Sequence, residues 1–445
     1  MLLGKDSSSS SFPGLSLGCC TPRASARGHS APFLSSTSNE TLPAEERGGL
    51  AIMHLYAFGS NGAGQLAIGH MEDVNTPARC LFVGDERPLP ASGDGDSLSP
   101  SLMQLIAGGN HTLIRLASGR VYAAGSNLHG ECATHASTQS LLRFQRVIIA
   151  EPLADVALAR CETSVFSNIS ATWSASFFVD VNKDSIFVAG HGSKGELGLG
   201  PDVTERTLPT KIPNFPPAGR YVVSIASGMA HTVALLDDGT IYGWGAARKG
   251  QLGADKVSQK VVWSPQKIVV GGNLPGHVRE ISCGREFTVL TTTSSAFLSY
   301  SGASSESLYI LGPDKWALSS AAPSMVAPYK SLNASWHGVY VHLRDGTVLA
   351  WGRNDRGQLP TATMPSLDYL AVGSEHVVGA IDHRTLIAFG WGEHGNCGPE
   401  TDEQGNVAGH WNEVQLPIDN CSIEAVGAGC ATSWVLLSEP EPNIR

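Results

Sequence analysis

The chain has no apolar run long enough to cross a bilayer, few basic residues and no paired cysteine motif. Its apolar stretches are interrupted well before the ~20 residues that a membrane-spanning helix needs, so we expect no membrane partner. Lys and Arg number 30 against 40 Asp and Glu, which leaves a net charge of -10. That balance disfavours a broad phosphate-binding surface, so we expect no direct contact with nucleic acid.

The nine cysteines include no C-x-x-C pair, which excludes the commonest zinc arrangements. Their number is odd and their spacing follows no pattern, as is typical of a reducing compartment. We therefore expect a cytoplasmic and nuclear protein.

Motifs for catalysis are also missing. The glycine cluster at residues 191–200 lacks the phosphate-loop register, and no G-x-S-x-G elbow assigns a nucleophile. Asp237 and Asp238 form a carboxylate pair, but Asp238-Gly239 is typical of a hairpin turn. We predict no enzyme, and no catalytic, cofactor-binding or metal-binding residues.

Glycine is abundant, at 50 of 445 residues, because a short unit repeats along the chain. The clearest copy, IASGMAHTVALLDDGTIYGWGAARKGQLG at 225–253, has an apolar strand, an Asp-Gly turn, a second strand and glycine-rich backbone. Similar segments lie at 105–133 and 370–398, with weaker copies at 169–200, 281–302 and 332–360. The glycines that end the second strand of each copy number seven: Gly59, Gly125, Gly190, Gly245, Gly302, Gly352 and Gly390.

The two ends of the repeat array complement each other. Residues 55–69 hold only the second half of a repeat, and residues 426–438 hold only the first half. Joining them completes one unit and hides the last sheet edges, which favours a ring over an open solenoid. We predict an all-β fold, a seven-bladed β-propeller over 53–438, closed by pairing the N- and C-terminal strands in one blade.

The segments outside the array lack its periodicity. Residues 1–52 are rich in Ser, Gly and Pro, so we expect a disordered N-terminal extension, and 439–445 a C-terminal tail. Two further interpretations of 1–52 stay open. One is that residues 1–52 are a targeting segment. The other is that translation begins at Met53, directly before the first strand.

The G-x-x-H-T, D-G-x-x-Y-x-W-G and G-Q-L-G elements within 225–253 resemble the regulator-of-chromosome-condensation repeat family. The resemblance extends over residues 53–438. Within that family, MHLYAFGSNGAGQLAIG and GWGEHGNCGPE are most similar to the fungal alpha-tubulin-suppressor group, also described as killer-toxin-insensitivity and diphthamide-synthesis accessory factors.

The resemblance implies a protein-binding subunit without a cofactor of its own. Such proteins form a heterodimer with a small metal-binding electron carrier in diphthamide synthesis, and support Elongator-dependent modification of tRNA wobble uridines. Two alternatives are a guanine-nucleotide exchange factor for a small GTPase and a generic propeller adaptor.

Two sets of residues stand out from the repeats. His111, His231 and His376 recur three residues after a glycine, so we interpret them as structural residues on inner strands that satisfy buried polar groups. The loop after Gly390 carries residues that break the repeat chemistry, and Cys397 there takes the place of a core leucine. Either its tryptophan packs against the next blade, or the loop binds a partner through Trp391, Glu393, His394 and Asn396, joined by Trp411 from the following insertion.

Overall fold

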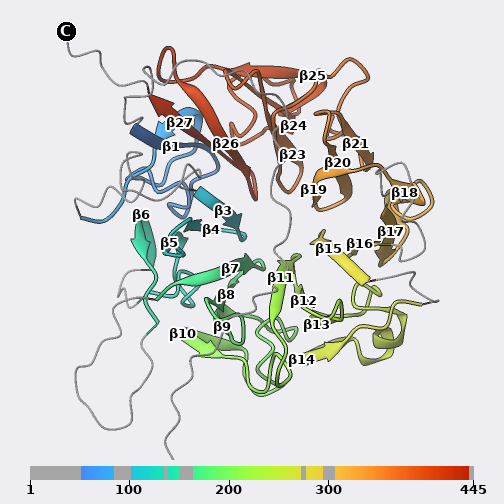
Figure 1. Ribbon diagram of the computed structural model, residues 1–445. Helices are drawn as coiled ribbons and strands as arrows, with labels where there is room; N and C mark the ends of the chain where they lie inside the picture. Colours follow the sequence, from blue (N-terminus) through green and yellow to red (C-terminus); the bar gives the residue numbers. More distant parts are fainter. Residues whose placement is uncertain are drawn as a thin grey trace, which may run out of the picture. The chain divides into compact units, whose positions relative to one another are not determined.

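A computed structural model describes residues 52–84, 102–134, 139–149, 164–271, 277–293 and 306–439. These residues form seven small antiparallel sheets arranged around a central axis, so the predicted seven-bladed β-propeller is confirmed (Figure 1). Within the described ranges, no helix is long and apolar enough to cross a membrane. The expected extension before Ile52 and the expected tail after Glu439 lie outside the described residues.

Each blade contributes its first strand to the axis and its last strand to the rim. We number the blades in chain order and count the closing blade as the seventh. Blade 1 contains β3 (Leu102–Ala107), β4 (His111–Leu116), β5 (Val121–Ser126) and β6 (Ser140–Arg146). Blade 2 contains β7 (Phe166–Ala171), β8 (Ala175–Asp180), β9 (Ile186–His191) and β10 (Glu205–Lys211). Blade 3 contains β11 (Val222–Ser227), β12 (His231–Leu236), β13 (Ile241–Ala246) and β14 (Val261–Lys267). Blade 4 contains β15 (His277–Cys283), β16 (Thr288–Thr293), β17 (Glu306–Leu311) and β18 (Met325–Val326). Blade 5 contains β19 (Tyr329–Ala334), β20 (Gly338–Leu343) and β21 (Val348–Gly352). Blade 6 contains β22 (Tyr369–Val372), β23 (His376–Ile381), β24 (Thr385–Trp391) and β25 (Asn406–Val414). Blade 7 contains β26 (Ser422–Ala428), β27 (Thr432–Glu439), β1 (Ile52–Gly59) and β2 (Val74–Arg79), and two short 3-10 helices, η1 (Ala254–Gln259) and η2 (Lys315–Ala317), lie in loops.

The two ends of the described chain share blade 7, as the half-repeats predict. β1 pairs with β27 in an unbroken antiparallel register, from Ile52 opposite Glu439 to Gly59 opposite Thr432. β26 and β2 complete the sheet on either side. Closure therefore depends on strands that are nearly four hundred residues apart in sequence.

A glycine lies within one residue of the end of the third strand in each blade, because a side chain there would collide with the turn between the first two strands. Gly245 has φ +101°, and a Cβ there would stand 2.5 Å from the carbonyl oxygen of Ala230. In blade 4, Gly302 is the wrong residue for this role, and it lies outside the described residues. β17 ends at Leu311, and Gly312, with φ +137°, lies against Phe287 in the corresponding way.

The same backbone contact divides the propeller into two faces. A backbone N–H at the end of the third strand donates a hydrogen bond to the turn between the first two strands, as Trp391 N does to Glu375 O at 2.9 Å. We call this side the loop face, since the long connections after each third strand lie there. The hairpin face carries the turns between the second and third strands, including Asp238-Gly239 and Asp345-Gly346.

The repeated histidines fasten neighbouring blades together, which confirms their structural role. His231 Nε2 lies 3.1 Å from Thr288 Oγ1 of the next blade, and that hydroxyl donates to Gln251 O at 2.8 Å. His111 and His376 contact Ser176 and Ser433 in the same way, each at 2.9 Å. They open the second strand of their blades, so the predicted inner-strand position is wrong by one strand.

The glycine of G-x-x-H is required because the imidazole occupies the space of its side chain. A Cβ at Gly228 would collide with the carbonyl oxygen of Gly284 in the next blade and would stand 2.5 Å from Cε1 of His231. The three imidazoles are fully buried, and desolvation lowers the pKa of each to about 4. They are therefore neutral at pH 7.

Candidate partner-binding face

The predicted loop after Gly390 presents an accessible aromatic and ionisable cluster. Trp391 ends β24, is half-buried, and donates from Nε1 to Glu393 Oε2 at 3.1 Å. The His394 ring meets the Trp391 ring edge-on at 5.3 Å between centroids. Arg356 of blade 5 stacks on Trp391, with its Cζ 5.2 Å from the ring centroid.

A contact with blade 7 fixes this cluster from the other side. His394 Nδ1 lies 2.8 Å from Asp73 Oδ2, and the other oxygen of Asp73 accepts from Asn61 N at 2.6 Å. The cluster thus joins loops of three blades. Sequence reasoning missed Arg356 and Asp73 because both reach Trp391 or His394 only through the ring.

A buried carboxylate orders the seam beneath the cluster. Glu375 accepts from His337 Nδ1 at 2.9 Å, Gln358 Nε2 at 2.7 Å and Arg353 at 3.1 Å. Burial by itself raises the pKa of Glu375, but the hydrogen bonds from His337 and Gln358 and the Arg353 charge outweigh it, so the pKa lies below its usual value. The loops of blades 5 and 6 are therefore held together by an ionised group.

Two of the predicted site residues have a different role. Asn396 is 0 % exposed and donates from Nδ2 to Trp391 O at 2.7 Å, so its side chain shapes the loop and offers a partner no surface. Trp411 is half-buried in β25 and packs against the apolar core of blade 6. Cys397 is buried in that core, as expected.

A second tryptophan with a stacked arginine lies on the same face. Trp316 in η2 is 40 % exposed, and the Arg353 Cζ stands 5.4 Å from its ring centroid. Lys315 Nζ lies 5.6 Å from the same ring. Sequence reasoning missed this tryptophan because the repeat that contains it was aligned on Gly302.

Two further tryptophans meet at the mouth of the central channel. Trp173 of blade 2 and Trp336 of blade 5 lie across the axis, with ring centroids 6.0 Å apart. Trp173 is 38 % exposed, and Arg285 stacks on Trp336 with its Cζ at 4.9 Å from the centroid. Three tryptophans of the loop face thus have an arginine on the ring.

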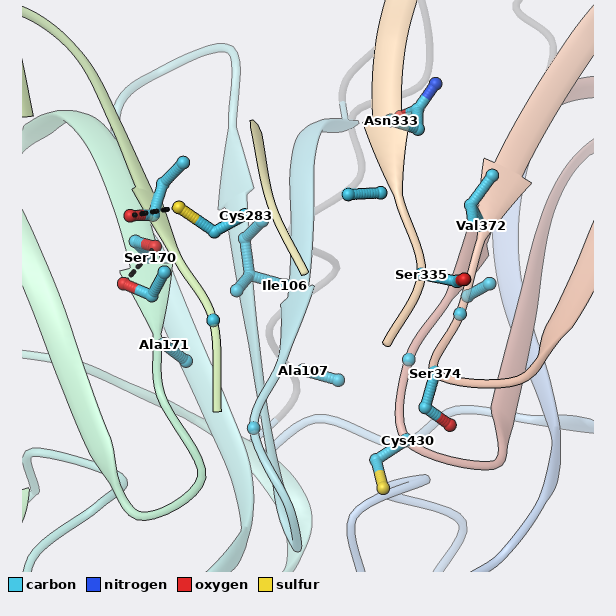
Figure 2. Close-up of a pocket in the computed structure, with 18 of the residues that line it drawn as sticks. Ile106, Ala107, Ser170, Ala171, Cys283, Asn333, Ser335, Val372, Ser374 and Cys430 are labelled. Carbon is cyan, nitrogen blue, oxygen red and sulfur yellow. Dashed lines mark hydrogen bonds between the residues drawn. The ribbon is translucent and has the colours of Figure 1, made fainter. Parts of the chain in front are cut away.

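The channel beneath these rings has a volume of about 480 Å³ and is lined by the first strands and turns of all seven blades. Figure 2 shows small side chains there, with Cys430 near Ser374, and the Cys283 thiol donates to Ala226 O at 3.5 Å. Among the described residues that line it, none carries a charged side chain. Burial raises the pKa of both thiols, that of Cys283 to about 12, so neither is a thiolate nucleophile at pH 7.

The side chains of the loop face are suited to binding a protein, and those that the structure describes are not arranged as metal ligands. Among the residues that the structure describes, no group of three or more His, Cys, Asp or Glu side chains is placed to hold a metal ion. Exposed tryptophan and arginine are the side chains most enriched at the energetic centres of protein interfaces. The loop face therefore has the composition of a protein-binding surface.

Comparison with known proteins identifies the class and then the family. The described residues form a β-propeller of six four-stranded blades and one three-stranded blade. The RCC1-like domain family model matches residues 54–435. The chain belongs to the RCC1-like domain family, which the sequence resemblance predicted.

Individual relatives cover most of the chain. An RCC1 repeat-containing protein of Schizosaccharomyces pombe, C10F6.04, is 26% identical over 400 residues, spanning 86% of this chain and 99% of that protein. The secretion-regulating guanine nucleotide exchange factor of Mus musculus is 24% identical over 435 residues, spanning 87% and 84%. The crystal structure of Prp20p from Saccharomyces cerevisiae has a TM-score of 0.65 at 17% identity, covering 87% of this chain and 91% of that one, a likeness of fold.

Proposed function

We propose that this chain is a protein-binding propeller that acts through its loop face. The observation that carries the proposal is the set of three tryptophans on that face, Trp316, Trp336 and Trp391, each with an arginine stacked on its ring. A cation over an exposed ring is worth roughly 0.5 to 1 kcal/mol, and it presents a flat amphipathic surface that costs little entropy to bury.

The partner we propose is a small metal-binding electron carrier of diphthamide synthesis. Through this heterodimer the chain would also support Elongator-dependent tRNA modification in the cytoplasm and nucleus. The similarity of MHLYAFGSNGAGQLAIG and GWGEHGNCGPE to the fungal alpha-tubulin-suppressor group supports this choice. The second of these segments contains Trp391, Glu393 and His394.

The test is calorimetric binding of the purified full chain to the purified, metal-loaded carrier from the same organism. The Trp391→Ala, His394→Ala double variant should weaken binding on the order of thirtyfold, since truncation of an aromatic anchor costs ~2 kcal/mol. Its melting temperature should change little, because both side chains are partly exposed.

Trp411→Ala is the matched control, since it removes a tryptophan from the same blade that packs against the core. It should lower the melting temperature and leave the affinity of the folded protein unchanged. Absence of any complex with the carrier rejects the proposed partner. A complex that the double variant binds as tightly as the wild type rejects the Trp391 cluster as its site.

A second candidate function is guanine-nucleotide exchange on a small GTPase. The similarity to the Mus musculus secretion-regulating guanine nucleotide exchange factor, which extends over 87% of this chain, favours it. The measurement is release of a fluorescent guanine nucleotide from purified small GTPases of the same organism. Release accelerated at catalytic amounts of the chain would support exchange in place of the carrier-binding function.

A further inference from the structure

A basic patch lies on the loop face, away from the Trp391 cluster. Its members are exposed or half-buried cations of blades 2, 3 and 4, and none of them has an ion pair among the described residues. They are Lys194, Arg248, Lys249, Lys260 and Arg285.

Loop packing makes the patch continuous. A Cβ at Gly195 would stand 2.8 Å from the carbonyl oxygen of Val262, so the blade 2 loop that carries Lys194 rests on β14 of blade 3. Gly250 follows Lys249 and approaches Gly312 of blade 4 in turn. Arg285 extends the patch to the channel mouth, where it stacks on Trp336.

The opposite side of the loop face is acidic. The loops 60–73 of blade 7 and 392–405 of blade 6 contain no Lys or Arg. Blades 6 and 7 are each three blades from blade 3, the greatest separation that a ring of seven allows. Their acidic residues are Glu72, Asp73, Glu393, Glu400, Asp402 and Glu403.

Unpaired cations concentrated in one place on a protein of net charge -10 mark a surface for a ligand of opposite charge. We propose that an acidic polypeptide segment docks on the basic patch, with its carboxylates on Arg248, Lys249 and Lys260 and an apolar side chain on the Trp336–Arg285 pair. This proposal rests on the proposed function and defines the chemistry of the partner. It also gives the loop face a second contact area beside the Trp391 cluster.

The dimensions and surroundings of the patch favour polypeptide over nucleic acid. A nucleic acid needs a basic stripe that follows many phosphates, whereas this patch covers three blades. Exposed Asp202 and Glu286 lie in its margins and would repel a continuous phosphate backbone. Arginine beside tryptophan matches the composition of protein interfaces.

The experiment measures fluorescence polarisation of a labelled peptide of alternating Glu and Leu with the full chain, at low and at physiological salt. Matched probes are the peptide with Gln in place of Glu and a single-stranded RNA of equal length. We expect the Glu peptide alone to bind, more weakly at higher salt. Arg248→Glu, Lys249→Glu should weaken it by about tenfold or more, because two attractions become repulsions.

Arg344→Glu, Arg384→Glu is the matched control, because it changes the net charge equally on exposed hairpin turns of the other face. It should leave peptide binding within about twofold, since those charges lie on the opposite face of the propeller and salt screens their effect. RNA binding equal to that of the Glu peptide would assign the patch to nucleic acid. Salt-sensitive self-association of the chain that the patch variant abolishes would assign the patch to a second copy of this chain. Equal binding of the Glu peptide by the patch variant and the control variant would reject a localised site.

Failure of this proposal is distinguishable from failure of the proposed function. If the carrier binds and requires Trp391 while the Glu peptide does not bind, the basic patch is rejected and the function stands. If the Glu peptide binds as expected but the carrier forms no complex, the chemistry of the patch stands and the proposed partner is rejected.

Discussion

Three buried histidines should make the stability of the propeller fall steeply in mild acid. Burial lowers the pKa of His111, His231 and His376 to about 4, whereas an unfolded chain would bind the same protons near 6.5. Between these values the unfolded state binds more protons, so the free energy of unfolding decreases as the pH falls. Each histidine lowers the free energy of unfolding by up to ~1.4 kcal/mol per pH unit, and the three together lower it by roughly 4 kcal/mol per pH unit. The free energy of unfolding of a typical protein is about 5 to 15 kcal/mol.

The assay is urea unfolding of the full chain, followed by tryptophan fluorescence, at pH values from 7.5 to 5. The wild type should be stable at pH 7, and its free energy of unfolding should fall by roughly 5 to 6 kcal/mol on going to pH 5. His231→Gln should start less stable, because the bond to Thr288 is altered, yet its stability should fall less steeply by about 1.4 kcal/mol per pH unit. Exposed His410→Gln is the control. If His231→Gln shows the same dependence on pH as the wild type, the buried imidazole does not titrate as inferred.

Three further predictions follow from the packing of the ring. Deleting residues 422–445 removes β26 and β27 and unpairs β1, so circular dichroism should show loss of the single cooperative melt rather than a small shift. Gly228→Ala should cost about 1 to 3 kcal/mol in urea unfolding, because its Cβ would overlap the Gly284 carbonyl oxygen and the His231 ring. Gly219→Ala, which meets no neighbour but has φ +76°, should cost only the backbone strain. Trp244→Phe should cost about 1 to 3 kcal/mol, because it leaves the carbonyl of Glu196 without the indole donor that lies 2.9 Å away; an unchanged midpoint would show that water replaces the donor.

The repeat pattern predicted the architecture because each recurring residue meets a local geometric demand. A glycine three residues before His231 leaves room for the imidazole, and an Asp-Gly pair makes the turn between two strands. Complementary half-repeats predicted closure because each lacks the strands that the other supplies. These demands recur in several blades, so they are visible in a single sequence.

The interblade contacts could not be predicted in the same way. Asp73 and His394 are 321 residues apart and meet only when the ring closes. The wrong assignment of Gly302 has a local cause, since SSAFLSYSG imitates a glycine-ended strand and the true strand begins at Glu306. The burial of Asn396 could not be predicted because exposure of a loop side chain depends on the neighbouring blade. A Cβ at Gly59 of blade 7 would lie 2.9 Å from the Cβ of Asn396.

The most direct test of the partner-binding face is hydrogen exchange of backbone amides in the free chain and in its complex with the metal-loaded carrier. The proposed function predicts protection in the loop-face segments 313–318, 353–356 and 391–396, with the hairpin turns at 237–239 and 382–384 exchanging at unchanged rates. Protection confined to those hairpin turns would place the partner on the opposite face and contradict the account.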